Sequence, residues 1–118
     1  GYLQLAERLI TAPDNIDEGW NFGPDPLDNR PVEEVAQSLI AGLGRGRIER
    51  VPDPNAPVEK PLLTLDSSKA ASYLKWRPRF KFDATIALTA EWYSAWSRGE
   101  ALDAITRKQI ATYIQNGA

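Results

Sequence analysis

The side chains that could do chemistry in this 118-residue chain are restricted in type, because the sequence contains no histidine and no cysteine. Histidine is the commonest general base and metal ligand, and the cysteine thiolate is a common nucleophile and zinc ligand. Ser-His-Asp and Cys-His catalytic sites are therefore excluded within this chain, as are zinc sites built from these residues. Carboxylate, lysine, arginine, tyrosine and serine side chains remain. We predict no catalytic, cofactor-binding or metal-binding residue among them.

Arg30 is the first candidate for ligand binding. It lies just ahead of a predicted helix start, within the segment Asn-Arg-Pro-Val at 29–32. The dipole and the free amides of a helix N-terminus favour an anionic ligand. An exposed arginine that pairs with Asp25 or Asp28 is the alternative interpretation.

Two further sets of charged residues could contact a ligand. Glu59 lies in a proline-rich segment and could accept hydrogen bonds from sugar hydroxyls, or it could be an ordinary solvated glutamate. Arg77 and Arg79 flank Pro78, where they could reach a phosphate or serve as surface charges.

Other conspicuous residues have structural explanations. The glycines of segment 42–46 follow a predicted helix, whereas a phosphate-binding glycine loop joins a strand to a helix. We therefore interpret this segment as a helix end and a turn. The acidic pair Glu33 and Glu34 lies at a helix start, where carboxylates are favoured. The four tryptophans fit core positions, at 20, 76, 92 and 96.

Helices dominate the predicted elements that must position these side chains. Apolar residues recur at helical spacing, with start and end signals, over 2–11, 31–43, 69–74, 84–97 and 106–115. Pro31 is expected in a first turn, Asp83 as an N-cap, and Thr106 with Gln109 as a capping box.

Short apolar runs predict three strands, at 19–23, 48–51 and 62–65. The prolines of segment 52–61 predict an extended surface loop. Strands that are so few and so short cannot form an independent sheet. The predicted fold class is α/β, in the form of a mainly helical α+β fragment whose strands need neighbours.

Composition limits the class of protein further. The chain is 42% hydrophobic and 25% charged, as in a soluble globular domain, and its formal net charge is −2. Acidic residues are interspersed with the basic ones, so we expect no nucleic-acid partner. No apolar stretch approaches the roughly 20 residues of a membrane span, and we expect a cytoplasmic protein without a membrane partner. Because the chain lacks methionine and opens inside a predicted helix, we expect its natural start to lie elsewhere.

Three segments of the sequence carry a family resemblance. They are Gly-Tyr-Leu-Gln-Leu-Ala-Glu at 1–7, Trp-Asn-Phe-Gly-Pro at 20–24 with Arg-Pro-Val at 30–32, and Leu-Asp-Ser-Ser-Lys-Ala at 65–70 with Trp-Arg-Pro at 76–78. Together they resemble the C-terminal part of the CDP-glucose 4,6-dehydratases, a family of the extended short-chain dehydrogenase/reductase superfamily. The Asp-x-x-Lys and Trp-x-Pro motifs occur across that superfamily, while the other segments point to the CDP-glucose family.

The resemblance implies a domain organisation and a reaction. Residues 1–118 would be the small C-terminal substrate-binding part, and an N-terminal Rossmann domain absent from this chain would bind NAD and carry the acid/base residues. The implied reaction converts CDP-glucose to CDP-4-keto-6-deoxyglucose by oxidation at C4, loss of water across C5 and C6, and return of the hydride to C6. The substrate partner would be the nucleotide sugar, the full-length enzyme a homo-oligomer, and this piece alone inactive.

By position, the resemblance places Arg30 and Val32 near the nucleotide, and Glu59 where an acidic residue can bind the ribose. Two departures from the family pattern stand out. Val58 and Lys60 flank Glu59 where the family has His-Glu-Ala, and Lys75 replaces the usual glycine before Trp76. If the backbone at Lys75 is left-handed, the substitution costs roughly 1 kcal/mol.

Two alternatives remain open at this point. The chain could be the C-terminal part of another NAD-dependent nucleotide-sugar epimerase or dehydratase. It could instead be a non-catalytic interaction module whose tryptophan-rich helices dock a partner protein.

Overall fold

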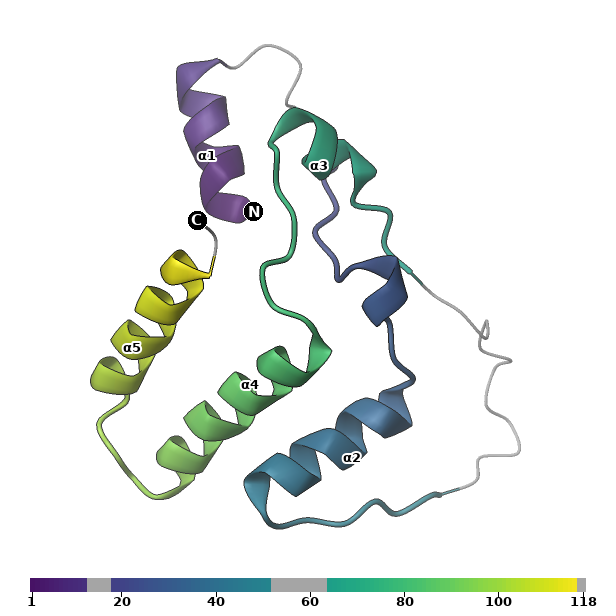
Figure 1. Cartoon of the computed structure of the whole chain (residues 1–118), viewed down its shortest axis with the longest axis vertical. Coiled ribbons are helices and arrows are strands. Elements are labelled where there is room, and N and C mark those ends of the chain that lie inside the picture. The colour runs from purple at the N-terminus through teal and green to yellow at the C-terminus, as the bar shows by residue number, and fades with distance from the viewer. Residues whose placement is uncertain (13–17, 52–63, 117–118) are drawn as a thin grey trace.

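The computed structural model describes residues 1–12, 18–51 and 64–116, which are largely helical (Figure 1). Within these ranges the regular elements are α1 (Tyr2–Thr11), the 3-10 helix η1 (Pro26–Asp28), α2 (Val32–Leu43), α3 (Ser68–Tyr73), α4 (Phe82–Ser97) and α5 (Leu102–Gln115). The prediction of a mainly helical chain is confirmed.

The predicted strands are wrong for the described residues, none of which forms a strand. Segments 19–23 and 48–51 are irregular, as are residues 64 and 65, while 62 and 63 lie outside the described ranges. A strand requires a neighbouring strand to pair its amides and carbonyls, and the described part of this chain provides none. The Gly23 amide is instead satisfied by a side chain, because it donates to Ser67 Oγ at 2.9 Å.

Four helix starts differ from those predicted, and that of α3 differs by one residue, since α3 begins at Ser68 rather than at 69. Helix α5 begins at Leu102 rather than Thr106, and Asp103 then lies in its first turn, where a carboxylate complements the helix dipole. Helix α4 begins at Phe82, so Asp83 lies in the first turn and Lys81 is the N-cap residue. Pro31 precedes α2 as its N-cap residue instead of standing in the first turn.

The pairing of α2 with α4 is the most extensive helix contact among the described elements, and α5 packs on α4. Figure 1 shows α4 between these two helices. The backbones of α2 and α4 approach closely, because a Cβ atom added at Gly42 would lie 2.7 Å from the Cβ of Ala90. Ala90 is only 2% exposed. A glycine on one helix and an alanine on the other therefore set the distance between the helix axes.

Aromatic side chains connect α1, the 20–23 segment and the residues that follow α3. The rings of Tyr2 and Phe22 meet edge to face at 5.2 Å between centroids, and Phe22 meets Trp76 in the same way at 5.1 Å. Helix α3 contributes Ala70, which is fully buried and whose carbonyl accepts the Trp76 amide at 3.2 Å. These contacts hold α1, the 20–23 segment and the chain after α3 together.

Little of the described chain is fully buried. The buried apolar residues are Ala70, Ala90 and Ala95, and no large side chain in the described ranges is below 2% exposure. The accessible surface is 9715 Å², against about 6400 Å² for a compact monomer of 13.1 kDa. The prediction of core tryptophans is wrong for Trp96, which is 61% exposed, while the other three are partly buried.

Lys75 has a left-handed backbone, with φ of 55°, so the condition under which lysine in place of the family's glycine would be costly is met. We expect Lys75→Gly to stabilise the chain by about 0.5–1 kcal/mol, because glycine adopts this conformation without strain. Urea unfolding at neutral pH measures the change. Arg77→Gly is the matched control: Arg77 does not have positive φ, so glycine there only adds unfolded-state entropy and should destabilise. An equal loss of stability in both variants would show that the backbone at Lys75 is not strained.

The close approach of α2 and α4 gives a second prediction. Gly42→Ala should destabilise by about 1 kcal/mol, because overpacking against Ala90 outweighs the better helix propensity of alanine. The double variant Gly42→Ala/Ala90→Gly moves the methyl group to the other helix and should recover most of the loss. Thermal unfolding of the two variants provides the test, and a stabilised single variant would show that the helices can separate freely.

Candidate functional site

Arg30 forms ion pairs at the start of α2. Its Nε lies 3.1 Å from Glu34 Oε1, and its NH2 nitrogen lies 3.8 Å from Asp28 Oδ1. The guanidinium carbon is also 5.5 Å from the centroid of the Phe82 ring. Of the two interpretations of Arg30, the described conformation is the ion-paired one. Two carboxylates thus compensate its charge, and an anionic ligand would have to displace them.

Asp28 links this loop to α4. One of its carboxylate oxygens faces Arg30, and the other accepts the backbone N–H of Phe82 at 2.5 Å. The side chain thereby satisfies an amide of the first turn of α4 from a distant part of the sequence. The position of Arg30 is therefore coupled to the position of α4.

Val32, the second predicted binding residue, lies within the described ranges. Val32 begins α2 and is 85% exposed beside Arg30. Glu59 lies outside the described residues. The structure brings Arg30 and Val32 together, and their role in binding stays a prediction.

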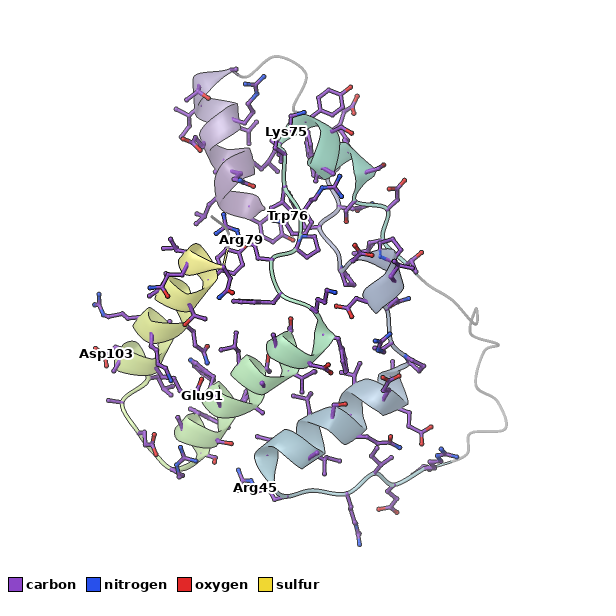
Figure 2. The ribbon with its side chains drawn as sticks, in the orientation of Figure 1. Arg45, Lys75, Trp76, Arg79, Glu91 and Asp103 are labelled. Atoms are coloured by element: carbon purple, nitrogen blue, oxygen red, sulfur yellow. The ribbon has the colours of Figure 1, made fainter. Side chains whose placement is uncertain are left out.

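A groove with a volume of about 1230 Å³ lies apart from the ion pairs of Arg30. It is lined by α1, the segment 75–80, α4 and α5, and its walls include the aromatic rings of Tyr2, Trp76, Phe80, Trp92 and Tyr113. Lys75, Arg77 and Arg79 line it as well, whereas none of its lining residues is an aspartate or glutamate. Figure 2 shows Lys75, Trp76 and Arg79 following one another along the chain between α3 and α4.

Arg79 anchors the end of α5 beside the groove. Its guanidinium donates to the backbone carbonyl of Tyr113 at 3.0 Å and lies 4.8 Å from the centroid of the Tyr113 ring. A cation near the last carbonyls of a helix is favoured by the helix dipole. The Phe80 ring meets Tyr113 edge to face at 5.5 Å. Arg79 therefore has a structural role in the described conformation.

Side-chain hydrogen bonds fix α5 against α4. Trp92 Nε1 donates to Thr106 Oγ1 at 3.1 Å, and Gln109 Nε2 donates to the Leu88 carbonyl at 2.9 Å. Glu91 accepts from Lys108 Nζ at 2.9 Å and from Gln109 Nε2 at 3.2 Å. In contrast, the buried Nε1 of Trp76 has no hydrogen-bond acceptor among the described residues.

The Asp-x-x-Lys motif is structural in the described conformation. Asp66 accepts the Ser68 amide at 2.9 Å at the start of α3, and this bond lowers the pKa of the Asp66 carboxyl. Lys69 Nζ lies 2.6 Å from Glu18 Oε2 and 4.4 Å from the centroid of the Trp20 ring. The motif thus starts a short helix and holds the 18–20 segment against it.

Sequence reasoning named Arg77 and Arg79 as possible phosphate contacts, but it missed the groove and the place of Lys75 in its lining. Between 75 and 82 the chain alternates basic residues at odd positions with Trp, Pro and Phe at even positions. The odd positions are exposed, and the even ones are partly buried except Pro78. This period of two is the signal that a search for continuous basic runs does not detect.

No protein-family model matches the chain. The CDP-glucose 4,6-dehydratase of Salmonella typhimurium strain LT2 is 34% identical to it over 114 residues, which cover 97% of this chain and 32% of that protein. The chain is a relative of the nucleotide-sugar 4,6-dehydratases. The resemblance that the sequence motifs predicted is confirmed.

A second 4,6-dehydratase supports the same relationship. The dTDP-glucose 4,6-dehydratase of Xanthomonas campestris pv. campestris strain B100 is 28% identical over 106 residues, covering 80% of this chain and 30% of that protein. The chain spans about a third of the length of both 4,6-dehydratases.

None of the described helices is both long and apolar enough to cross a membrane. In residues 1–12, 18–51 and 64–116, acidic side chains do not gather in threes as a metal ion would need.

The bonds of Glu91 predict an acid-sensitive contact between α4 and α5. The Lys108 ammonium and the Gln109 amide, which donate to Glu91, hold the pKa of its carboxyl below the ordinary value of 4.5. A lowered folded-state pKa adds stability that is present above the unfolded pKa and is lost as pH falls through the folded pKa. Glu91→Gln should therefore lower stability by about 0.5 kcal/mol at pH 7 and reduce the further loss below about pH 4.5.

Urea unfolding at pH 7 and at acidic pH measures both effects. Glu100→Gln is the matched control, because Glu100 pairs with Arg98 two residues away and not across two helices. If the two variants respond to acid alike, Glu91 has no special part in docking α5.

Proposed function

We propose that this chain is the nucleotide-sugar-binding part of a CDP-glucose 4,6-dehydratase. In this proposal residues 1–118 form its C-terminal substrate-binding region, and the whole enzyme is a cytoplasmic homo-oligomer. The observation that carries the proposal is the 34% identity to a CDP-glucose 4,6-dehydratase over 97% of the chain. The motifs that suggested the family lie at the start of α1, before η1, before α2 and around α3, and they all fall between residues 1 and 78.

The residues of this chain do not fit NAD. A dinucleotide pyrophosphate is held by a glycine turn between a strand and a helix, and the described part of the chain contains no strand. Its glycine-rich segment ends α2, with Gly44 in the left-handed conformation as the C-cap residue. We therefore assign NAD, and the acid/base chemistry of the elimination, to a Rossmann part of the enzyme outside these residues.

The contribution of this chain would be to bind and orient the nucleotide sugar. Arg30 would leave the carboxylates of Glu34 and Asp28 and bind a phosphate of the substrate. Guanidinium groups favour phosphate because they can donate two parallel hydrogen bonds to it. Val32 offers exposed apolar surface beside it for the nucleotide. Glu59 would accept hydrogen bonds from the ribose hydroxyls.

A second candidate substrate follows from the other relative. The 28% identity to a dTDP-glucose 4,6-dehydratase favours a thymidine-linked sugar as the alternative nucleotide. The two substrates share the diphosphate and the glucose. The choice between them therefore rests on contacts to the base and the ribose.

Turnover by a full-length protein that contains this chain tests the proposal. With NAD present, we expect it to convert CDP-glucose to the 4-keto-6-deoxy product faster than dTDP-glucose, as measured by chromatography of the sugar nucleotides. The 118-residue chain alone should give no product. Arg30→Gln should raise the KM for CDP-glucose about tenfold with little change in kcat, because one charge-assisted contact is lost.

Arg45→Gln is the control for the loss of one positive charge. Figure 2 shows Arg45 beyond the end of α2, away from the groove residues that it labels. This variant should keep the parent KM. Preference for dTDP-glucose would make the alternative substrate correct, and no turnover of either sugar would overturn the assignment.

A further inference from the structure

We propose that the groove between α1, the 75–80 segment, α4 and α5 binds a nucleoside phosphate, with Lys75 and Arg77 contacting the phosphates. Arg30 and Val32 do not line this groove, and the proposal concerns the 118-residue chain itself. The proposal therefore does not require the proposed enzymatic function to be correct.

The distribution of ion pairs is the first argument. Most of the other basic residues in the described ranges have a carboxylate within 4.0 Å, namely Arg30, Arg47, Arg50, Lys69, Arg98 and Lys108. No described carboxylate lies within that distance of Lys75, Arg77 or Arg79. In a chain of net charge −2, the groove thus concentrates three positive charges without a compensating acid.

The shape of the groove strengthens this charge. A concave site with low-dielectric walls focuses the field of its charges and raises the local concentration of counter-ions. Arginine suits phosphate because its planar guanidinium can donate two parallel hydrogen bonds, and lysine binds phosphate as a point charge. Arg79 already donates to α5, so Lys75 and Arg77 are the cations left to bind a ligand directly.

The aromatic walls are the second argument, because they select for a ligand that carries a ring. Tyr2 is 79% exposed and Tyr113 is 38% exposed, and both line the groove. Exposed aromatic faces stack well on nucleobases, and such stacking tolerates any base because every base has a π face. Cations beside aromatic rings match a molecule that has phosphates at one end and a base at the other.

The size of the groove is the third argument. Its volume of about 1230 Å³ exceeds the roughly 300–1,000 Å³ of ordinary small-molecule sites. A free phosphate ion would fill a small fraction of it, and a nucleoside diphosphate with its base and ribose would fill considerably more. These three observations together favour a nucleotide over an inorganic anion.

Calorimetric titration of the 118-residue chain at low ionic strength tests the proposal with two probes, cytidine 5′-diphosphate and inorganic pyrophosphate. We expect the diphosphate nucleotide to bind about tenfold more tightly than pyrophosphate, because pyrophosphate lacks the base. Arg77→Gln should weaken nucleotide binding about tenfold through loss of a charge-assisted contact. Arg45→Gln, which removes one exposed charge elsewhere, should leave it unchanged.

The Lys75→Gly variant distinguishes a loss of binding caused by a missing ligand contact from one caused by unfolding. It removes a groove cation while relieving the left-handed strain at that position, so the variant should be more stable and still bind the nucleotide several-fold more weakly. Circular dichroism confirms the fold of each variant before titration. A more stable Lys75→Gly chain that binds as tightly as the parent would overturn the role of Lys75.

Three other outcomes would overturn the proposal. Equal affinity for pyrophosphate and the nucleotide would mean that the aromatic walls do not contribute. Equal losses in Arg77→Gln and Arg45→Gln would mean that binding follows net charge alone. Loss of binding in Arg30→Gln with none in Arg77→Gln would place the nucleotide at the start of α2, which supports the proposed function and removes the groove site.

Discussion

The close approach of α2 and α4 at Gly42 and Ala90 is the constraint on which the rest of the described structure depends. Packing of small residues lets the two backbones come together, so α4 has a defined position against α2. Helix α4 in turn carries α5 through its side-chain hydrogen bonds. Its first turn is tied back to the loop before α2 by the Asp28 carboxylate. The position of Arg30 and the α4–α5 side of the groove therefore depend on this helix pair, whereas the α1 side of the groove is held by the contacts of Tyr2, Phe22 and Trp76.

Local patterns in the sequence predicted the helices well, because the spacing of apolar residues within one helix is recorded in consecutive residues. The bounds of α1 agree with the prediction, and those of α2 and α4 differ by one or two residues at their starts. The start of α5 was wrong by four residues because a plausible capping box at Thr106 lies inside the helix. The strands were wrong because pairing depends on a neighbour that no local pattern reveals.

At the candidate sites too, contacts between residues close together in the sequence could be predicted, and contacts between distant residues could not. The ion pair of Arg30 with Asp28 could be anticipated, since only one residue separates them along the chain. Its contact with Phe82 could not, because more than fifty residues intervene. The family's glycine at position 75 raised the possibility of a left-handed backbone there, which the lysine in this sequence alone would not have suggested. The groove was missed because α1 and α5, which form its walls, are far apart in the sequence.

The absence of acidic residues from the lining of the groove has a kinetic consequence. The formal net charge of the chain is only −2, and an approaching anion is attracted where Lys75, Arg77 and Arg79 line the same groove. Over distances of about 10 Å at moderate salt, such a field turns random encounters into oriented ones. The arrangement of charges, more than their sum, then determines which encounters are productive.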